Sequence, residues 1–379
     1  MNASSAVLLS LFVCACSSGG GTPADAGSDA GGFGFAPSNL GDLLSTLDLS
    51  KLGDIDATGQ DLVDVDCGAT APGFCLQADV TQSDGSTLHV YVARSWKVEQ
   101  TAKLTVTAKT PIAIVATNDI DILGKLDASS QDFGGIGGGY SGTVQSKGAG
   151  PGGGGIGSEV DDTPGVGGGG GAFCGAGGKG GDTSGAMGVG GTPYGSPTLV
   201  PLSGGSAGGG AELFGGAGGG AIQLVAAHAI TISGVVAAGG GGGSNGGPYS
   251  AGQASSGGGS GGALLLEAPS VTVSGTLAVN GGGGGSTGAK GADATPDATP
   301  AAGGEPTSDG AGGDGSAAAT TAGADGKTGD TTGTGTRDVA GGGGGGAGYI
   351  RINTTSGAAS ITGVLSPALG PCATQGTLH

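Results

Sequence analysis

The stretch AIQLVAAHAITISGVVAAGGGGG, residues 221–243, decides the predicted fold. Aliphatic residues alternate with small or polar ones from Ile222 to Ala226 and again, after a short turn, from Ile230 to Ala238. Alternation with a period of two is typical of a β-strand with one buried face. The stretch therefore predicts short strands that run directly into a block of glycines.

Three other segments repeat this pattern. IAIVATNDIDILGKLDAS begins at Ile112, ALLLEAPSVTVSGTLAVNGGGGG begins at Ala263 and YIRINTTSGAASITGVLSPA begins at Tyr349. A further alternating segment begins at Leu88. A short repeat of this kind buries its aliphatic side chains only by stacking on its neighbours. We therefore predict an all-β fold, a parallel β-helix with solenoid-like rungs and long poly-Gly loops, after a small N-terminal segment and a disordered tether.

Glycine separates the predicted fold into strands and inserts. Of 379 residues, 97 are Gly and only 3% are aromatic, which excludes an ordinary domain with a large aromatic core. The Gly-rich β-solenoid is predicted over residues 87–372, with inserts at 129–220, 239–262 and 281–347 and a tail at 373–379. Extended poly-Gly segments can lie side by side in a polyproline-II-like geometry. We expect the ends of the inserts to be packed, their middles to be mobile and residues 286–338 to be disordered.

The charge of the chain excludes one class of partner. Twelve Lys and Arg residues stand against 30 Asp and Glu residues, and the formal net charge is −18. Nucleic-acid binding depends on clustered Lys and Arg, so we expect no nucleic-acid partner. Gly326–Thr328 matches the end of a phosphate-binding loop, but Thr321 stands where its first Gly belongs. No cofactor is therefore predicted.

The first residues have the features of an export signal. The apolar run from Ala6 to Ala15 is too short to span a bilayer, which takes about 20 residues. Residues 1–15 are predicted to be a signal peptide, and 16–37 a flexible Gly/Ala/Asp/Ser tether. The sequence from Val13 to Cys16 resembles the bacterial lipoprotein signal. The resemblance implies lipidation at Cys16 and a lipid-anchored place at the outer membrane or cell surface. A cleaved secretory peptide without lipid is the alternative.

Four cysteines remain in the mature chain. Cys67 and Cys75 lie in a distinct segment, predicted over 38–86, and a disulfide between them is the default for an exported protein. Cys174 and Cys372 are predicted to form the second disulfide. The Asp residues between 54 and 66, or a single copy of a calcium-binding nonapeptide start at 177–182, make calcium an alternative. Neither pattern has the spacing of a complete site, so no metal site is predicted.

Matches to catalytic motifs are weak. Gly204–Gly208 and Gly258–Gly262 match G-x-S-x-G, but no strand–turn–helix context surrounds them. No catalytic residues are therefore predicted. The main rival interpretation is a polysaccharide lyase or hydrolase. On the predicted rungs, the candidate catalytic residues for it are Asp121, Lys125 and Asp127, all on the first rung. A carbohydrate-binding module is the third interpretation, and it would need exposed aromatic residues.

The alternation of strands and poly-Gly over 112–370 resembles the large Gly-rich repeat proteins of bacterial surfaces, often called PE-PGRS-like. The acidic tether is similar in style to those of myxobacterial lipoproteins. Nothing in 17–86 resembles the helical Pro-Glu domain of the mycobacterial family. The resemblance implies a lipid-anchored surface protein with a structural or adhesive role and no catalytic activity. Its expected partners are the membrane, through the lipid, and a cell-surface or matrix polysaccharide. The alternative is a carbohydrate-binding or polysaccharide-degrading β-helix protein.

Overall fold

The computed structural model describes residues 32–58, 75–160, 163–182, 187–246, 254–306, 310–329 and 340–379. These residues form three larger sheets and one two-stranded hairpin, with a four-residue helix α1 (Leu43–Thr46) and a turn of 3-10 helix η1 (Leu49–Lys51). The predicted signal peptide 1–15, Cys16 and Cys67 lie outside the described residues. Within them, no helix has the length and apolar character needed to cross a bilayer.

The seven-stranded sheet follows the order β2-β3-β6-β11-β14-β17-β20. Its strands are β2 (Cys75–Thr81), β3 (Thr87–Ala93), β6 (Ile112–Ala116), β11 (Ala221–Ala226), β14 (Ala263–Glu267), β17 (Tyr349–Thr354) and β20 (Ala373–Thr377). All neighbours pair in parallel except β2 and β3, which are antiparallel. The strand β20 lies in the segment predicted to be a tail.

Two smaller sheets complete the arrangement. The six-stranded sheet contains β1 (Asp54–Ala57), β4 (Ser95–Val98), β7 (Ile120–Ile122), β12 (Ala229–Ile232), β15 (Ser270–Val273) and β18 (Ser360–Ile361). The five-stranded sheet contains β5 (Lys103–Thr105), β8 (Lys125–Asp127), β13 (Val235–Ala237), β16 (Thr276–Ala278) and β19 (Val364–Ser366). Both are wholly parallel. The hairpin pairs β9 (Ser158–Val160) with β10 (Thr163–Val166).

The register of the sheets confirms the alignment of the strand segments made from the sequence. Ile222 lies opposite Ile112 on one side and Leu264 on the other. In the next sheet Ile230 lies opposite Ile120 and Val271. Aliphatic residues at equivalent positions therefore stack on one another from strand to strand.

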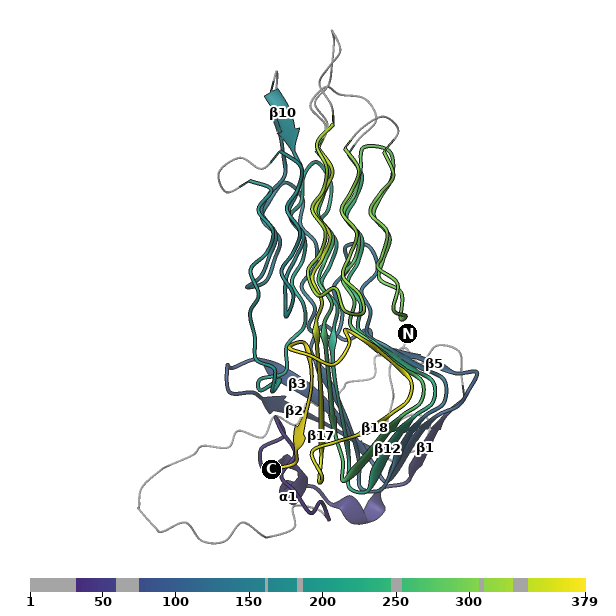
Figure 1. The fold of residues 1–379 in the computed structure, drawn as a ribbon. Helices are drawn as coiled ribbons and strands as arrows, with labels where there is room; N and C mark the ends of the chain where they lie inside the picture. Colours follow the sequence, from purple (N-terminus) through teal and green to yellow (C-terminus); the bar gives the residue numbers. More distant parts are fainter. Residues whose placement is uncertain are drawn as a thin grey trace, which may run out of the picture.

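Two apolar cores hold the sheets together. Side chains from all three sheets meet in the space that they enclose in Figure 1, among them Ile114, Ile230 and Val236, each at most 3% exposed. Trp96 is also buried there, and its Nε1 donates to the Val115 carbonyl at 3.0 Å. Burying each such aliphatic side chain contributes about 2 kcal/mol.

The outer face of the seven-stranded sheet forms the second core. Val115, Val225 and Leu265 point away from the enclosed space and are fully buried. The side chains that cover them include Phe33, Leu40, Leu44, Phe173, Leu199 and Leu202. The N-terminal segment that carries α1 and η1 therefore packs on this sheet, and Phe33, near the end of the predicted tether, is part of the fold.

A buried carboxylate fastens this N-terminal segment. Glu267 is 1% exposed and accepts four hydrogen bonds. Ser38 donates through its amide at 3.0 Å and its hydroxyl at 2.7 Å, while Gln223 Nε2 donates at 2.8 Å and Asn353 Nδ2 at 3.1 Å. Since a buried charge is tolerated only where donors surround it, these bonds fix Ser38 over the sheet.

The glycine-rich segments form a second body above the sheets in Figure 1, where they run side by side as extended, gently undulating traces. Segment 341–346 is surrounded by other segments. Its successive amides donate to 324–327, 282–285 and 168–171, and then to the same three segments in the same order. Its carbonyls accept from three further segments, 178–181, 313–316 and 258–261. A repeat of three residues per turn is the geometry of a polyproline-II helix, so this body is a bundle of such helices bonded laterally.

Glycine is required in this bundle because the backbones approach so closely. A Cβ on any residue of 341–346 would overlap a carbonyl oxygen of a neighbouring segment. At the edge of the bundle a side chain fits at every third position, as at Ala176, Lys179 and Asp182. The spacing follows from the threefold turn, which points every third residue in the same direction.

The predicted fold class, an all-β parallel β-helix with poly-Gly loops, is wrong. The described residues form three mostly parallel sheets, one of them mixed, with almost no helix. No closed solenoid is present in this part of the chain, because after β8, β13 and β16 the backbone leaves the sheets for the glycine-rich bundle. The predicted loops also have order: in the segment expected to be disordered, the Ala292 amide donates to the Ala302 carbonyl, and the Gly304 amide donates to Gly284 just before that segment. Lateral hydrogen bonds in several directions compensate the entropy of ordering glycine.

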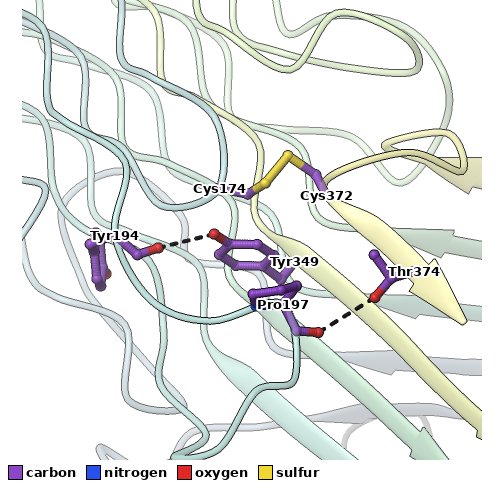
Figure 2. Close-up of a disulfide and its surroundings, with 6 residues drawn as sticks. All are labelled: Cys174, Tyr194, Pro197, Tyr349, Cys372 and Thr374. Atoms are coloured by element: carbon purple, nitrogen blue, oxygen red, sulfur yellow. Dashed lines mark hydrogen bonds between the residues drawn. A yellow bond between two sulfur atoms is a disulfide. The ribbon is translucent and has the colours of Figure 1, made fainter. Parts of the chain in front are cut away.

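The predicted disulfide between Cys174 and Cys372 is confirmed (Figure 2). It joins the glycine-rich bundle to the start of β20, and the two cysteines are 198 residues apart in the sequence. Closing so long a loop lowers the entropy of the unfolded chain and stabilises the fold by roughly 5 kcal/mol in the chain-entropy description. Two hydrogen bonds flank it, from Tyr349 to the Tyr194 carbonyl at 3.2 Å and from Thr374 to the Pro197 carbonyl at 3.4 Å.

Candidate binding site

The carboxylates proposed for polysaccharide cleavage lie on different sheets. Asp127 belongs to β8, where Lys125 Nζ lies 2.7 Å from its Oδ2 and only 7% of its side chain is exposed. Asp121 belongs to β7 in the six-stranded sheet, on the side that carries Lys97. The ion pair of Lys97 with Glu99, and more weakly its charge interactions with Asp56 and Asp121, raise the pKa of that lysine. Asp121 and Asp127 therefore stand on strands of two different sheets, and Asp127 is paired with Lys125.

The serines of the two G-x-S-x-G matches are packing residues in the bundle. Ser206 and Ser260 are fully buried, and the Ser206 amide donates to Ser260 Oγ at 2.9 Å. Ser206 Oγ in turn donates to the Tyr194 hydroxyl at 3.0 Å. Burial raises the pKa of Tyr194. These hydroxyls satisfy polar groups between neighbouring segments, which is a structural use of serine.

The possible calcium ligands are engaged with protein groups. Asp54 forms an ion pair with Arg94, whose hydrogen bond lowers the pKa of this carboxyl. Asp182 accepts a hydrogen bond from Thr328 Oγ1 at 3.0 Å. The described residues contain no group of three or more His, Cys, Asp or Glu side chains placed to hold a metal ion. Asp61, Asp64 and Asp66 lie outside the described residues.

The remaining predicted site residues are cysteines. Cys75 is disulfide-bonded, while its predicted partner Cys67 lies outside the described residues. The lipidation site Cys16 is outside them as well. The cysteines that the structure describes, Cys75, Cys174 and Cys372, are disulfide-bonded, and a binding surface has to be sought elsewhere.

Exposed aromatic side chains gather at one loop, residues 131–142, which leads from the five-stranded sheet into the bundle. Within the described residues, Phe133, Tyr140 and Phe214 are the aromatic side chains that are more than a third exposed, at 48%, 38% and 36%. Phe133 and Tyr140 belong to the loop, and Phe214 stacks on Phe133 with ring centroids 4.3 Å apart. An exposed aromatic ring offers a stacking surface to a ligand. Of these three rings, Tyr140 lines a cleft beside the loop.

A cleft of about 410 Å³ lies on one side of this loop. Its walls come from four segments: the turn 84–87 between β2 and β3, residues 109–111 before β6, residues 135–141 of the loop, and residues 202–203. This volume falls in the range of ligand sites for small molecules. We refer to it as the polar cleft because six of its thirteen lining residues carry a hydroxyl group.

Hydrogen bonds fix the walls of the polar cleft. The amide of Gln82, 6% exposed, bridges two of them. Its Nε2 donates to Ser86 Oγ and to the Leu202 carbonyl, each at 2.9 Å, and its Oε1 accepts from the Leu202 amide at 2.7 Å. The loop itself is pinned by the Gly135 amide, which donates to Ser141 Oγ at 3.2 Å. The cleft is therefore preorganised before any ligand enters.

Close packing also determines the path of the loop. Gly138 has a φ of +81°, a left-handed value that favours glycine. A Cβ there would come within 2.6 Å of the Pro111 ring. The loop can therefore pack against Pro111, which lines the cleft, only with glycine at position 138.

One negative and one positive group face the polar cleft. Hydrogen bonds from the Ser86 hydroxyl at 2.6 Å and amide at 3.0 Å hold the pKa of Asp84 below its usual range, so the carboxylate is ionised at neutral pH. Lys109 Nζ donates to the Gly135 carbonyl at 2.8 Å. The two charges balance, so the lining of the cleft carries no net charge.

Sequence analysis did not find this site. Tyr140 and Phe133 stand out only as the aromatic residues in an otherwise glycine-rich stretch, and a single ring in such a stretch has no periodic pattern. Asp84 and Lys109 are far apart in the sequence. Only the pairing of β3 with β6 brings their segments together.

The comparisons with known proteins identify no relative. No protein-family model matches the chain, and searches of the curated proteins and of the solved structures return no match. The functional conclusion therefore depends on the geometry of this chain.

Proposed function

We propose that this chain is a lipid-anchored cell-surface protein with a structural or adhesive role and without catalytic activity. The observation that carries the proposal is the laterally bonded glycine bundle. Successive amides of 341–346 bond to three different neighbours, so the segment is held in every direction across its axis. Such a bundle is stiff although it contains few side chains, and stiffness is what a spacer or support at a surface requires.

The charge and the disulfide support a place outside the cytoplasm. A net charge of −18 keeps a surface protein soluble around its anchor and separates neighbouring copies. The disulfide Cys174–Cys372 persists in oxidising compartments. The resemblance of Val13–Cys16 to a lipoprotein signal supplies the anchor at Cys16. More than one acyl chain is needed for stable anchoring, as in the bacterial lipoproteins that this signal resembles.

The anchor is tested by metabolic labelling with palmitate in a bacterium that processes lipoproteins. We expect the wild-type chain to carry the label, Cys14→Ala to keep it and Cys16→Ala to lose it. Protease treatment of intact cells then measures surface exposure. A wild-type chain without label, or one protected from protease in intact cells, contradicts a lipid-anchored surface protein.

The adhesive role is tested on whole cells. Cells that display the wild-type chain should be retained on a polysaccharide-coated surface more strongly than cells that produce Cys16→Ala, which is released from the membrane. Equal retention of both would contradict the adhesive role. The polysaccharide-degrading alternative predicts turnover that is lost in Asp121→Asn or Asp127→Asn, and the separation of these carboxylates on two sheets does not support it.

A further inference from the structure

We propose that the polar cleft binds a neutral sugar ring, with the Tyr140 side chain stacked against the apolar face of that ring. The proposal deepens the adhesive function and rests on it, because it names the ligand class and the place of contact. It is carried by three properties of the cleft, which are its hydroxyl-rich lining, its charge balance and its exposed aromatic ring.

The lining fits a polyhydroxylated ligand. Residues that carry hydroxyls line the cleft on every wall: Ser86, Thr87, Thr110, Tyr140, Ser141 and Ser203. Each hydroxyl can both donate and accept, as each sugar hydroxyl does. An apolar ligand would make no use of these hydroxyls, whereas a sugar can exchange hydrogen bonds with them.

The charges exclude strongly anionic ligands. The cleft holds one carboxylate, Asp84, and one ammonium, Lys109, and the ammonium already donates to Gly135. A phosphate or sulfate site usually offers several cationic or backbone donors. The net charge of −18 also repels an anionic glycan. The remaining class that matches the hydroxyls is a neutral saccharide.

The Tyr140 ring supplies an apolar surface of the right kind. The ring packs on its inner side against Gly150, where a Cβ would lie within 2.7 Å of ring atom Cδ2. Tyr140 also lines the cleft and is 38% exposed. The C–H bonds on one face of a pyranose pack against an aromatic ring, whose face carries partial negative charge. Tyr140 therefore offers the stacking contact while the surrounding hydroxyls bond to the edges of the sugar.

The size and rigidity of the cleft agree with a small sugar unit. A cavity of about 410 Å³ accommodates a ligand of one or two rings. Its walls are cross-linked by Gln82 and by the bond from Gly135 to Ser141, so little conformational entropy is lost on binding. A chain end or branch of a surface polysaccharide is the form in which such a unit would reach the protein.

The test is saturation-transfer NMR on the full-length chain, in a detergent without a sugar headgroup. The probes are glucose, galactose, mannose, N-acetylglucosamine and their disaccharides, with glucuronate and inorganic phosphate as anionic comparisons. We expect saturable binding of at least one neutral saccharide, and weaker or no binding of the anions. Absence of saturable binding for every neutral saccharide, or binding of the anions alone, overturns the proposal.

Variants locate the site. Tyr140→Leu keeps apolar bulk but removes the ring, and it should weaken binding about tenfold or more, whereas Tyr140→Phe should stay within about threefold of wild type. Phe214→Ala is the matched control, because it removes an exposed ring outside the cleft. If Phe214→Ala weakens binding as much as Tyr140→Leu does, or Tyr140→Leu leaves it unchanged, the assignment to the polar cleft is wrong. Circular dichroism on each variant confirms that it is folded.

The outcomes separate this proposal from the proposed function. A chain that is labelled by palmitate and retains cells, but gives no saccharide signal, overturns the cleft and leaves the surface role standing. A chain without label whose saccharide binding is lost in Tyr140→Leu overturns the anchor and leaves the cleft standing.

Discussion

The sheets and the glycine-rich bundle use the same chain in opposite ways. In the sheets, each strand bonds to at most two neighbours and fills the space between layers with side chains such as Leu224 and Leu266. In the bundle, segment 341–346 bonds to six neighbours, and a side chain at any of its residues would overlap a carbonyl oxygen. The stability of the sheets depends on the volume of buried apolar side chains, and the stability of the bundle depends on the absence of side chains.

The two regions are nevertheless continuous. The strands β11, β14 and β17 begin directly after Gly220, Gly262 and Gly348, so segments that neighbour one another in the bundle enter the seven-stranded sheet as neighbouring strands. Gly262 accepts from the amide of Tyr349, and Gly220 accepts from the amide of Ala263. The order of neighbouring strands in the sheet therefore matches the order of neighbouring segments in the bundle. Substitutions in each region can show which physical requirement dominates there.

The largest effect is expected from a side chain introduced at the centre of the bundle. Gly343→Val places a branched Cβ against the carbonyl of Gly178, and the backbone on every side prevents the segment from moving away. We expect a loss of about 4 kcal/mol or more in the free energy of unfolding, or failure to fold. Guanidinium unfolding followed by circular dichroism measures it.

Gly343→Ala is the milder companion and should also destabilise the chain, since even one methyl group overlaps the Gly178 carbonyl. A variant at Gly343 with the stability of wild type would show that the bundle is loosely packed. The contrast between the two regions would then be lost.

The sequence predicted the sheets in part. Alternation in segments such as Ala221–Ala226 identified the strands, and the position of each turn set the register correctly. It did not predict that both faces of the seven-stranded sheet are buried. The signal was present in IAIVA and ALLLE, where aliphatic residues occupy both parities, as in strands covered on two sides. The covering segments lie far away in the sequence, so no local pattern identifies them.

The bundle and the cleft were harder to predict. Poly-Gly has no side-chain pattern, and the period of three appears only at edge segments such as 176–182. Whether a glycine run is ordered depends on how many neighbours it finds, which is a property of the whole fold. The cleft is likewise assembled from four distant segments around Tyr140. The disulfide Cys174–Cys372 was predictable because an even number of cysteines left only this pair.

An intermediate effect is expected in the sheets. Leu266 is fully buried in the enclosed core, opposite Leu224 and Ile352. Leu266→Ala should cost about 3 kcal/mol, because it removes apolar contacts and leaves a cavity. Leu266→Met conserves volume and should cost less than about 1.5 kcal/mol. The same guanidinium unfolding measures both, and equal losses for the two variants would show that volume is not what the sheets require.

The smallest effect is expected where the bundle meets solvent. Lys179 occupies the outward position of an edge segment and its side chain is exposed, so Lys179→Ala should change the unfolding free energy by no more than about 0.5 kcal/mol. Its neighbour Gly178 points inward, and a Cβ there would overlap the Ala324 carbonyl, so Gly178→Ala should destabilise strongly. Both variants create the same alanine one residue apart on the same segment. One removes an exposed side chain and the other adds a methyl group against a neighbouring backbone, so similar stabilities for the two would contradict the threefold rule on which the bundle depends.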